Sequence, residues 1–203
     1  MQLTLIRHGE TIWNLEKRVQ GLTDIELNET GIDQARKLAL SLQDFPIDTI
    51  YSSPLKRAFQ TAEIINRFHR KDIRVEPGLM EMDQGEFEGL TFQELLAREK
   101  DFIRKWIADP ESVRMPGGES LAELQNRAWP PVEKLLAAGQ NALIVSHNFT
   151  IAAILCRLRN IRLSEFRSTC VDNASRTHIR IHNGEAHIEA INDVRHLKTE
   201  ADV

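Results

Sequence analysis

The sequence is poor in cysteine and has no long apolar run. Two cysteines, Cys156 and Cys170, occur in 203 residues, with no paired metal-ligand spacing. We expect both to be reduced packing residues, which favours a reducing compartment and a cytoplasmic location. No apolar run approaches the roughly 18 residues of a membrane span, and the N-terminus lacks the basic and apolar regions of a signal peptide. The sequence therefore predicts no membrane partner.

The chain also lacks an excess of positive charge. Its net charge is −4, and no long block of one sign occurs. Proteins that bind nucleic acid usually present a basic face, so we expect no nucleic-acid partner. An anionic substrate would have to be attracted by a few locally placed cations, because the chain as a whole carries negative charge.

The remaining composition is that of a globular protein. Hydrophobic residues make up 41% of the chain and charged residues 28%. The length fits one domain spanning residues 1–203. Between about 77 and 140 the sequence pattern changes: this segment has two glycine-bearing loops and helical stretches near 91–108 and 119–138. We interpret it as a cap-like insertion.

Short apolar runs alternate with helical patterns along the chain. The predicted strands are 2–7, 47–51, 73–75, 141–146, 175–182 and 185–191, and the last two flank Asn183-Gly184, a hairpin signal. The predicted helices run from 30 to 43 with Thr30 as N-cap, from Ser53-Pro54 to 68, and from 149 to 158. Residues 8–29 are predicted to be a loop, and 197–203 a frayed tail. This order predicts an α/β fold with three layers, α/β/α: a mostly parallel sheet, an edge hairpin and a small helical cap.

Chemically active side chains follow three of these strands. They are Arg7-His8-Gly9 after the first strand, Ser52–Arg57 after the second, and Ser146–Asn148 after the strand at 141–146. In open α/β sheets, ligands bind outside the carboxyl ends of the strands. The sequence therefore predicts one site that contains two histidines, Arg7 and Arg57.

Two arginines and two histidines suit phosphoryl chemistry. Guanidinium forks match phosphate oxygens, and the helix after Pro54 would add backbone N–H donors. Neighbouring cations would keep one imidazole neutral, so that it can attack phosphorus, while a protonated His147 would stabilise the transferring group. Gly9 would allow close approach to the ligand. No acidic cluster indicates a metal site, so we expect no metal and no cofactor.

A leaving alkoxide needs a proton donor. Glu81 lies in an acidic loop between apolar residues, where partial burial would raise the pKa of a carboxyl group and keep it protonated. Asp83, Glu86 and Glu88 lie nearby, and each is an alternative acid.

The sequence resembles the histidine phosphatase superfamily, in the branch that includes cofactor-dependent phosphoglycerate mutases and related phosphatases. The resemblance covers nearly the whole chain. It is carried by 5–11 (LIRHGET), Trp13-Asn14, 20–24 (QGLTD), Leu27-Asn28, Gly31, Ser52–Pro54, Arg57, Thr61-Ala62, Glu81, Gly85, Gly89, Gly117–Ser120 and Val145–His147. One departure is Asn148-Phe149 after His147, where many members carry glycines.

The resemblance implies a role for each matching residue. His8 would accept the phosphoryl group, and Glu81 would protonate the leaving group and then activate water. The remaining implied contacts are Arg7, Arg57 and His147 in the phosphate pocket, Asn14 as a further phosphate ligand, and Gln20 and Gly21 on the substrate.

The segment between Glu81 and His147 favours a phosphatase over a mutase. It is shorter than in phosphoglycerate mutases and has no paired arginines to grip a substrate carboxylate. The ending 191–197 resembles α-ribazole phosphatases and phosphoserine phosphatases of this superfamily. We expect a small phosphorylated metabolite as partner, α-ribazole 5′-phosphate or a phosphoserine-like compound. A phosphoglycerate mutase and a non-catalytic phospho-ligand module are the alternatives, and the chain would be a monomer or a homodimer.

Overall fold

A computed structural model gives the structure of residues 1–183 and 185–198. Within these residues, six strands form one sheet in the order β3-β2-β4-β1-β5-β6. The strands are β1 (Gln2–Arg7), β2 (Thr49–Ser52), β3 (Ile73–Val75), β4 (Ala142–Ser146), β5 (Arg176–His182) and β6 (Glu185–Asp193). The first four in this order are parallel, whereas β5 and β6 form an antiparallel hairpin at the edge. The predicted α/β class, with a mostly parallel sheet and an edge hairpin, is confirmed.

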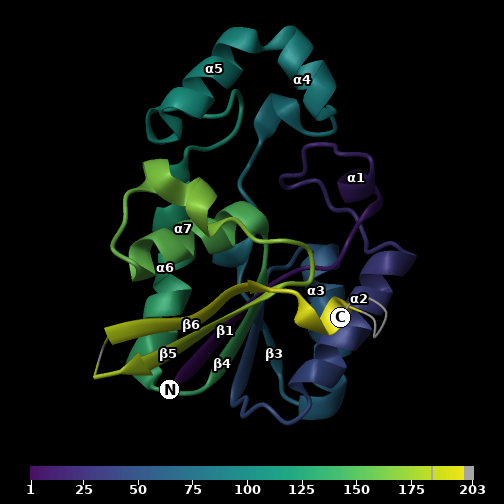
Figure 1. Cartoon of the computed structure of the whole chain (residues 1–203), viewed down its shortest axis with the longest axis vertical. Helices are drawn as coiled ribbons and strands as arrows, with labels where there is room; N and C mark the ends of the chain where they lie inside the picture. Colours follow the sequence, from purple (N-terminus) through teal and green to yellow (C-terminus); the bar gives the residue numbers. More distant parts are fainter. Residues whose placement is uncertain (184, 199–203) are drawn as a thin grey trace.

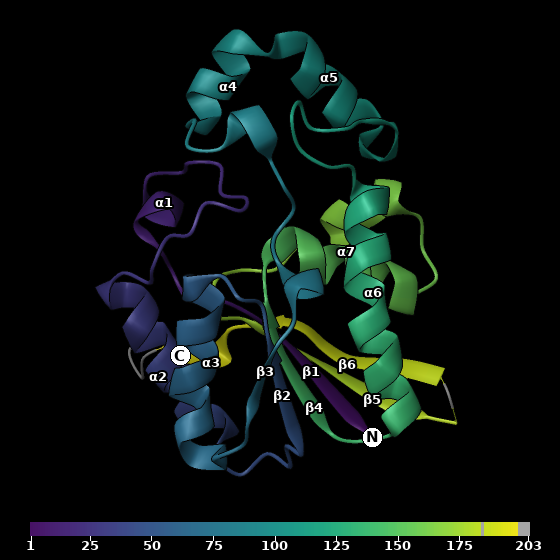
Figure 2. The same cartoon turned by 180° about the vertical axis from the view of Figure 1, so that it is seen from behind.

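Helices cover both faces of the sheet (Figures 1 and 2). One face packs on α2 (Glu29–Leu42) and α3 (Lys56–His69), and the other on α6 (Leu121–Ala138) and α7 (Asn148–Leu158). Side chains alternate along each strand, so Ile6 faces the first pair of helices and Leu5 the second. These two buried layers hold the strand ends rigidly in place.

Two further helices, α4 (Phe92–Arg98) and α5 (Lys100–Ala108), lie above the carboxyl edge of the sheet (Figure 1). Apolar side chains from both helices join a third buried cluster with α7 and the 3₁₀ segment η4 (Leu163–Thr169). Helix α6 begins in the same stretch of sequence but packs along the sheet. Only part of the segment 77–140 therefore lies over the strand ends.

The predicted helix starts differ from the structure in two places. Helix α2 begins at Glu29 and is capped by Asn28, whose Oδ1 accepts from the Gly31 N–H at 2.8 Å, so Thr30 is not the cap. Helix α3 begins at Lys56 rather than at Pro54, because Leu55 keeps an extended backbone. A short helix, α1 (Ile12–Leu15), interrupts the loop predicted at 8–29.

The β5–β6 turn and the C-terminal segment are described only in part. The predicted turn Asn183-Gly184 is described only at Asn183, which has a left-handed φ of 52°, because residue 184 lies outside the described residues. Of the predicted frayed tail, Leu197 closes a 3₁₀ turn, η5 (Arg195–Leu197), and packs against the first buried layer. Residues 199–203 lie outside the described residues. No helix among those described is long and apolar enough to span a membrane.

Candidate active site

The segments predicted to form a site meet at one cavity. Strands β1 and β4 are paired in register, with Arg7 opposite Ser146, and β2 pairs with the other side of β4. The residues that follow these strands consequently lie side by side at the carboxyl edge of the sheet. A cavity of about 260 Å³ opens there, and its polar lining comprises Arg7, His8, Asn14, Arg18, Gln20, Arg57, Glu81, Gln84 and Asn148.

His8 is held in one tautomer and one charge state. Its Nδ1 lies 2.7 Å from the Gly9 carbonyl oxygen, so Nδ1 carries the proton and donates it, leaving Nε2 with a free lone pair. Burial lowers the pKa of His8 well below 6.5, and the charges of Arg57 and Arg7 lower it further. The neutral ring is thus a nucleophile whose reactive nitrogen is fixed by its own backbone.

Two arginines surround this imidazole. Arg57 is fully buried, and its terminal nitrogens donate to the carbonyl oxygens of Thr23 at 2.9 Å and Gly21 at 2.7 Å. Arg7 donates to the Val171 carbonyl at 2.6 Å. The Nε atoms of both arginines are buried and have no partner among the described residues. Each guanidinium group is therefore oriented by backbone carbonyl oxygens and retains N–H donors for an anion.

His147 is buried, and its surroundings favour the neutral ring over the protonated form expected from the sequence. Burial lowers its pKa well below 6.5, and Arg57 and His8 contribute to the same effect. Its ring lies 5.1 Å from that of His8, centroid to centroid, and its Nε2 is 2.8 Å from Ser53 Oγ. Its buried Nδ1 has no partner in the described structure and remains available to a ligand bound at His8, although His147 itself is not among the residues that line the cavity.

One of the backbone donors predicted at the start of α3 is already engaged. The Lys56 N–H donates to Asp24 Oδ1 at 2.7 Å, while Ser53 Oγ accepts from the Leu55 N–H at 3.2 Å and contacts His147. Gly9 is also required for a different reason from the predicted one. A Cβ at Gly9 would lie 2.4 Å from the Gly31 carbonyl oxygen, so the residue allows β1 and α2 to approach closely.

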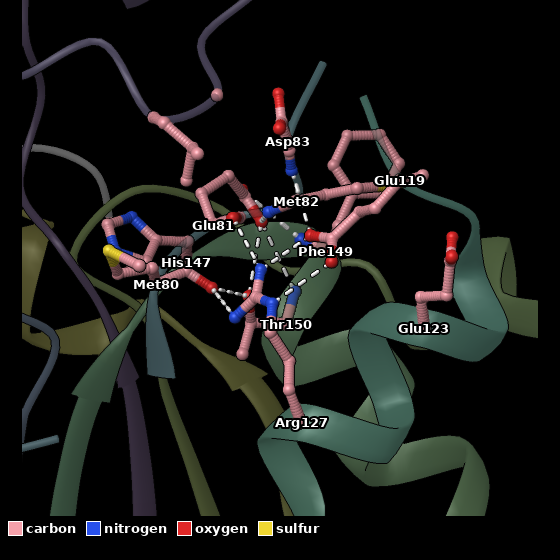
Figure 3. Close-up of polar contacts among 12 residues, drawn as sticks. Met80, Glu81, Met82, Asp83, Glu119, Glu123, Arg127, His147, Phe149 and Thr150 are labelled. Atoms are coloured by element: carbon pink, nitrogen blue, oxygen red, sulfur yellow. Dashed lines mark hydrogen bonds and ion pairs between the residues drawn. The ribbon is translucent and has the colours of Figure 1, made fainter. Parts of the chain in front are cut away.

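Glu81 lies at the N-terminus of α7, beside His147 (Figure 3). Its carboxylate accepts from the N–H groups of Met82 at 2.9 Å, Thr150 at 3.3 Å and Phe149 at 3.4 Å. Burial raises the pKa of Glu81 above its ordinary value of 4.5, although these donors and Arg57 act in the opposite direction. A buried carboxyl group with a raised pKa can donate a proton.

The three alternative acids do not line the cavity. Glu88 accepts from the N–H groups of Leu22 and Thr23, so it shapes the loop whose carbonyls hold Arg57. Asp83 accepts from the Gly85 N–H, and Glu86 is exposed. Of the four carboxylates in this loop, Glu81 alone is placed to reach a ligand beside His8.

Asn14 and Gln20 line the cavity, whereas Gly21 does not. Asn14 Oδ1 accepts from Thr11 and from Asn173 Nδ2 at 3.2 Å, which leaves its amide N–H₂ as the free end. Gln20 donates to Thr11 Oγ1 at 2.8 Å, and its buried Oε1 has no partner in the described part of the chain. Gly21 acts through its carbonyl oxygen, which orients Arg57.

Sequence reasoning missed two polar residues of the site, Asn173 and Gln84, and the apolar wall of the cavity. Asn173 donates to the His8 carbonyl oxygen at 3.2 Å and to Asn14, but it lies 165 residues from His8 and follows no strand. Gln84 is 4% exposed, with a buried Nε2 that lacks a partner in the described residues. The apolar wall of the cavity was also missed, and it comprises Val19, Phe87, Phe92, Leu95, Phe102, Ile103, Trp106, Met115 and Phe149.

Comparison with known proteins agrees with this geometry. The sequence matches the histidine phosphatase superfamily (branch 1) over residues 3–194. Phosphoserine phosphatase 1 of Hydrogenobacter thermophilus is 36% identical over 199 residues, which cover 97% of this chain and 94% of that protein. The chain therefore belongs to the histidine phosphatase superfamily, and it is a phosphatase that acts on phosphoric monoesters.

Two solved structures have the same fold over almost their whole length. The alpha-ribazole phosphatase from Shigella flexneri has a TM-score of 0.87 at 28% identity, covering 96% of this chain and 97% of that one. A phosphoserine phosphatase from Entamoeba histolytica, in complex with 3-phosphoglyceric acid, has a TM-score of 0.85 at 30% identity, covering 97% and 99%.

Proposed function

We propose that this phosphatase transfers the phosphoryl group of a small monoester to His8 and then to water. In the first step, His8 Nε2 donates its lone pair to phosphorus, the P–O ester bond breaks, and the alkoxide takes a proton from Glu81. In the second step, ionised Glu81 accepts a proton from water, whose oxygen attacks phosphorus. The P–N bond then breaks, its electron pair returns to His8, and inorganic phosphate leaves.

The free Nε2 of a neutral, buried His8 is the observation that carries this proposal. Its partner nitrogen is engaged by Gly9, so the reactive atom is chosen before substrate arrives. Arg7, Arg57 and the unpartnered Nδ1 of His147 provide donors for the phosphoryl oxygens. These fixed donors stabilise the charge of the transferring group without a metal ion. Asn14 and Gln20 complete the polar end of the cavity.

The apolar wall of the cavity supports a substrate with an apolar ring. Aromatic side chains from α5 and α7, Phe102, Trp106 and Phe149, belong to this wall. A phosphoserine-like substrate needs an anion for its ammonium group, yet Glu81 is the only carboxylate among the described lining residues. Arg18 could face a carboxylate, but it already donates to Glu16 and to the Gly89 carbonyl. We favour α-ribazole 5′-phosphate or a chemically similar phosphomonoester.

Phosphate release in the presence of EDTA tests this proposal. The substrates are α-ribazole 5′-phosphate, phosphoserine, 3-phosphoglycerate and 4-nitrophenyl phosphate, with His8→Ala as the matched control. We expect EDTA to have no effect, His8→Ala to release no phosphate, and α-ribazole 5′-phosphate to have the highest kcat/KM. Release by clean His8→Ala would refute the mechanism. Phosphoryl exchange from a bisphosphate without phosphate release would instead identify a mutase.

A further inference from the structure

The loop that carries Glu81 is attached to the sheet at its start, where Ser146 of β4 donates to the Leu79 carbonyl at 2.7 Å. Residues 80–84 then connect two 3₁₀ turns, η1 (Pro77–Leu79) and η2 (Gly85–Phe87), and belong to no helix or strand of the described structure. A proton donor must nevertheless stay within hydrogen-bond reach of the leaving oxygen. Side chains from other elements therefore have to hold this loop in place.

Arg127 contacts this loop from the first half of α6 (Figure 3). Its Nη1 donates to the carbonyl oxygens of Gly78 and Met80, both at 2.9 Å, and its Nη2 donates to that of Glu81 at 2.7 Å. One guanidinium group thus binds three carbonyls along the stretch that leads into Glu81. A lysine ammonium is a single point of charge and cannot reproduce this planar fork.

Glu119, which lies just before the N-cap of α6, completes the arrangement. Its two carboxylate oxygens accept from Arg127, Oε1 from Nη2 at 2.5 Å and Oε2 from Nε at 3.0 Å. Its Oε1 also accepts from the Asp83 N–H at 2.8 Å, and its own N–H donates to the Asp83 carbonyl. The ion pair consequently bonds the loop on both sides of Glu81. The carbonyls of Gly78 and Met80 accept from Arg127 before it, and Asp83 contacts Glu119 after it.

The ion pair touches the loop but not the substrate cavity. Neither Arg127 nor Glu119 lines the cavity, and their side chains are 26% and 13% exposed. The carboxyl group of Glu81 is held separately by N–H groups of Met82, Phe149 and Thr150. Thr150 Oγ1 also donates to the Met80 carbonyl at 2.7 Å, so loss of the ion pair would release the Gly78 and Glu81 carbonyls and the Asp83 N–H and leave the contacts of His8, Arg7 and Arg57 unchanged.

We propose that Arg127 and Glu119 are positioning residues for the proton transfer made by Glu81. This inference rests on the proposed function. The ion pair aims the Glu81 carboxyl at the leaving oxygen, so its loss slows the steps that need proton transfer and leaves phosphate binding intact. Misplacing a catalytic group by about 1 Å can lower a rate by roughly 100-fold.

The test compares kcat/KM for two substrates that differ in the need for an acid. Benzyl phosphate releases an alkoxide that must be protonated, whereas 4-nitrophenyl phosphate releases a stable phenolate. In a two-step reaction, kcat/KM reports only the steps up to release of the alcohol. We expect Arg127→Lys and Glu119→Gln each to lower kcat/KM for benzyl phosphate by about 10-fold or more, and that for 4-nitrophenyl phosphate by less than about threefold.

Two substitutions at a neighbouring ion pair serve as matched controls. Arg114 and Glu123 also form an ion pair near the start of α6, and both are largely exposed. We expect Arg114→Lys and Glu123→Gln to leave both substrates unchanged. Circular dichroism checks that each variant is folded, and Glu119→Gln tests the inference alone if Arg127→Lys does not fold.

Failure of the inference can be distinguished from failure of the proposed function. If Glu81→Gln impairs benzyl phosphate selectively but Arg127→Lys and Glu119→Gln lower both substrates equally, the ion pair is only structural and the inference is wrong. If Glu81→Gln itself shows no selectivity, or His8→Ala remains active, the proposed function is wrong, and the inference fails with it.

Discussion

Burial is the largest cause of the pKa shifts at the site. Burial lowers the pKa values of His8 and His147, and the charges of the arginines lower them further. Burial raises the pKa of Glu81, whereas the charges of Arg57 and Arg7 oppose this rise. The sequence predicted neighbouring guanidinium groups as the reason for a neutral His8, but it could not show that the residue is only 3% exposed. Burial thus favours the neutral forms of both the nucleophile and the acid within one cavity.

These shifts set the expected pH dependence of the first step. Since Glu81 must be protonated and its pKa lies above 4.5, kcat/KM for benzyl phosphate should fall as pH rises through that pKa. Since the pKa of His8 lies well below 6.5, activity should not fall near pH 6.5 on the acid side. The measurement is the ratio of kcat/KM for benzyl and 4-nitrophenyl phosphate against pH in the wild type and in Glu81→Gln, because the ionisation of the two substrates is the same with both proteins. Glu81→Gln should flatten it, and an unchanged slope would assign the proton to another group.

At the scale of elements, the cap of α2 illustrates a limit of sequence reasoning. Both Asn28 and Thr30 are good N-cap types, and the structure selects Asn28 because its Oδ1 reaches the Gly31 N–H while its Nδ2 reaches Glu10. Asn28→Ala should lower the free energy of unfolding by about 1 kcal/mol. Thr30→Ala, at an exposed position inside the helix, is the control. Equal loss in both variants, measured by urea denaturation, would contradict the assignment.

The helices α4 and α5 are predicted to select the leaving group. Trp106 lines the cavity, whereas its neighbour Ile107 is 63% exposed. Trp106→Ala should lower kcat/KM for an aromatic phosphomonoester by about 10-fold, since losing buried aromatic area costs roughly 1.5 kcal/mol or more. Glycerol phosphate should be little affected, and Ile107→Ala should change neither substrate. A loss that is the same for both substrates would show that the wall does not contact the leaving group.

Periodicity located most elements but not their mutual contacts. The strands at 2–7 and 73–75 match β1 and β3, and α3 ends within one residue of its predicted end. Position after a strand placed His8, Arg57 and His147 at one edge of the sheet, because parallel strands share one carboxyl edge, and the ring centroids of His8 and His147 are 5.1 Å apart. Asn173 and the apolar wall could not be found this way, since they depend on how loops and α5 fold over that edge.

At the scale of the whole molecule, the chain concentrates positive charge at one point. The net charge is −4, yet Arg7 and Arg57 converge on a single cavity at the sheet edge. Among residues 1–183 and 185–198, no group of three or more metal-ligating side chains is close enough to hold an ion. In the proposed mechanism the arginines would bind the phosphoryl group, and α4 and α5, which lie above the carboxyl edge of the sheet (Figure 2), would cover the leaving group.

Trapping the phosphorylated enzyme tests the central claim most directly. Glu81→Gln should slow hydrolysis of the intermediate, so the protein can be mixed with 4-nitrophenyl phosphate, quenched in alkali and digested for mass spectrometry. We expect the phosphoryl group on His8, none on His147, and no labelled protein from the Glu81→Gln variant that also carries His8→Asn. A phosphoryl group on any other residue, or labelling that survives His8→Asn, would contradict the mechanism.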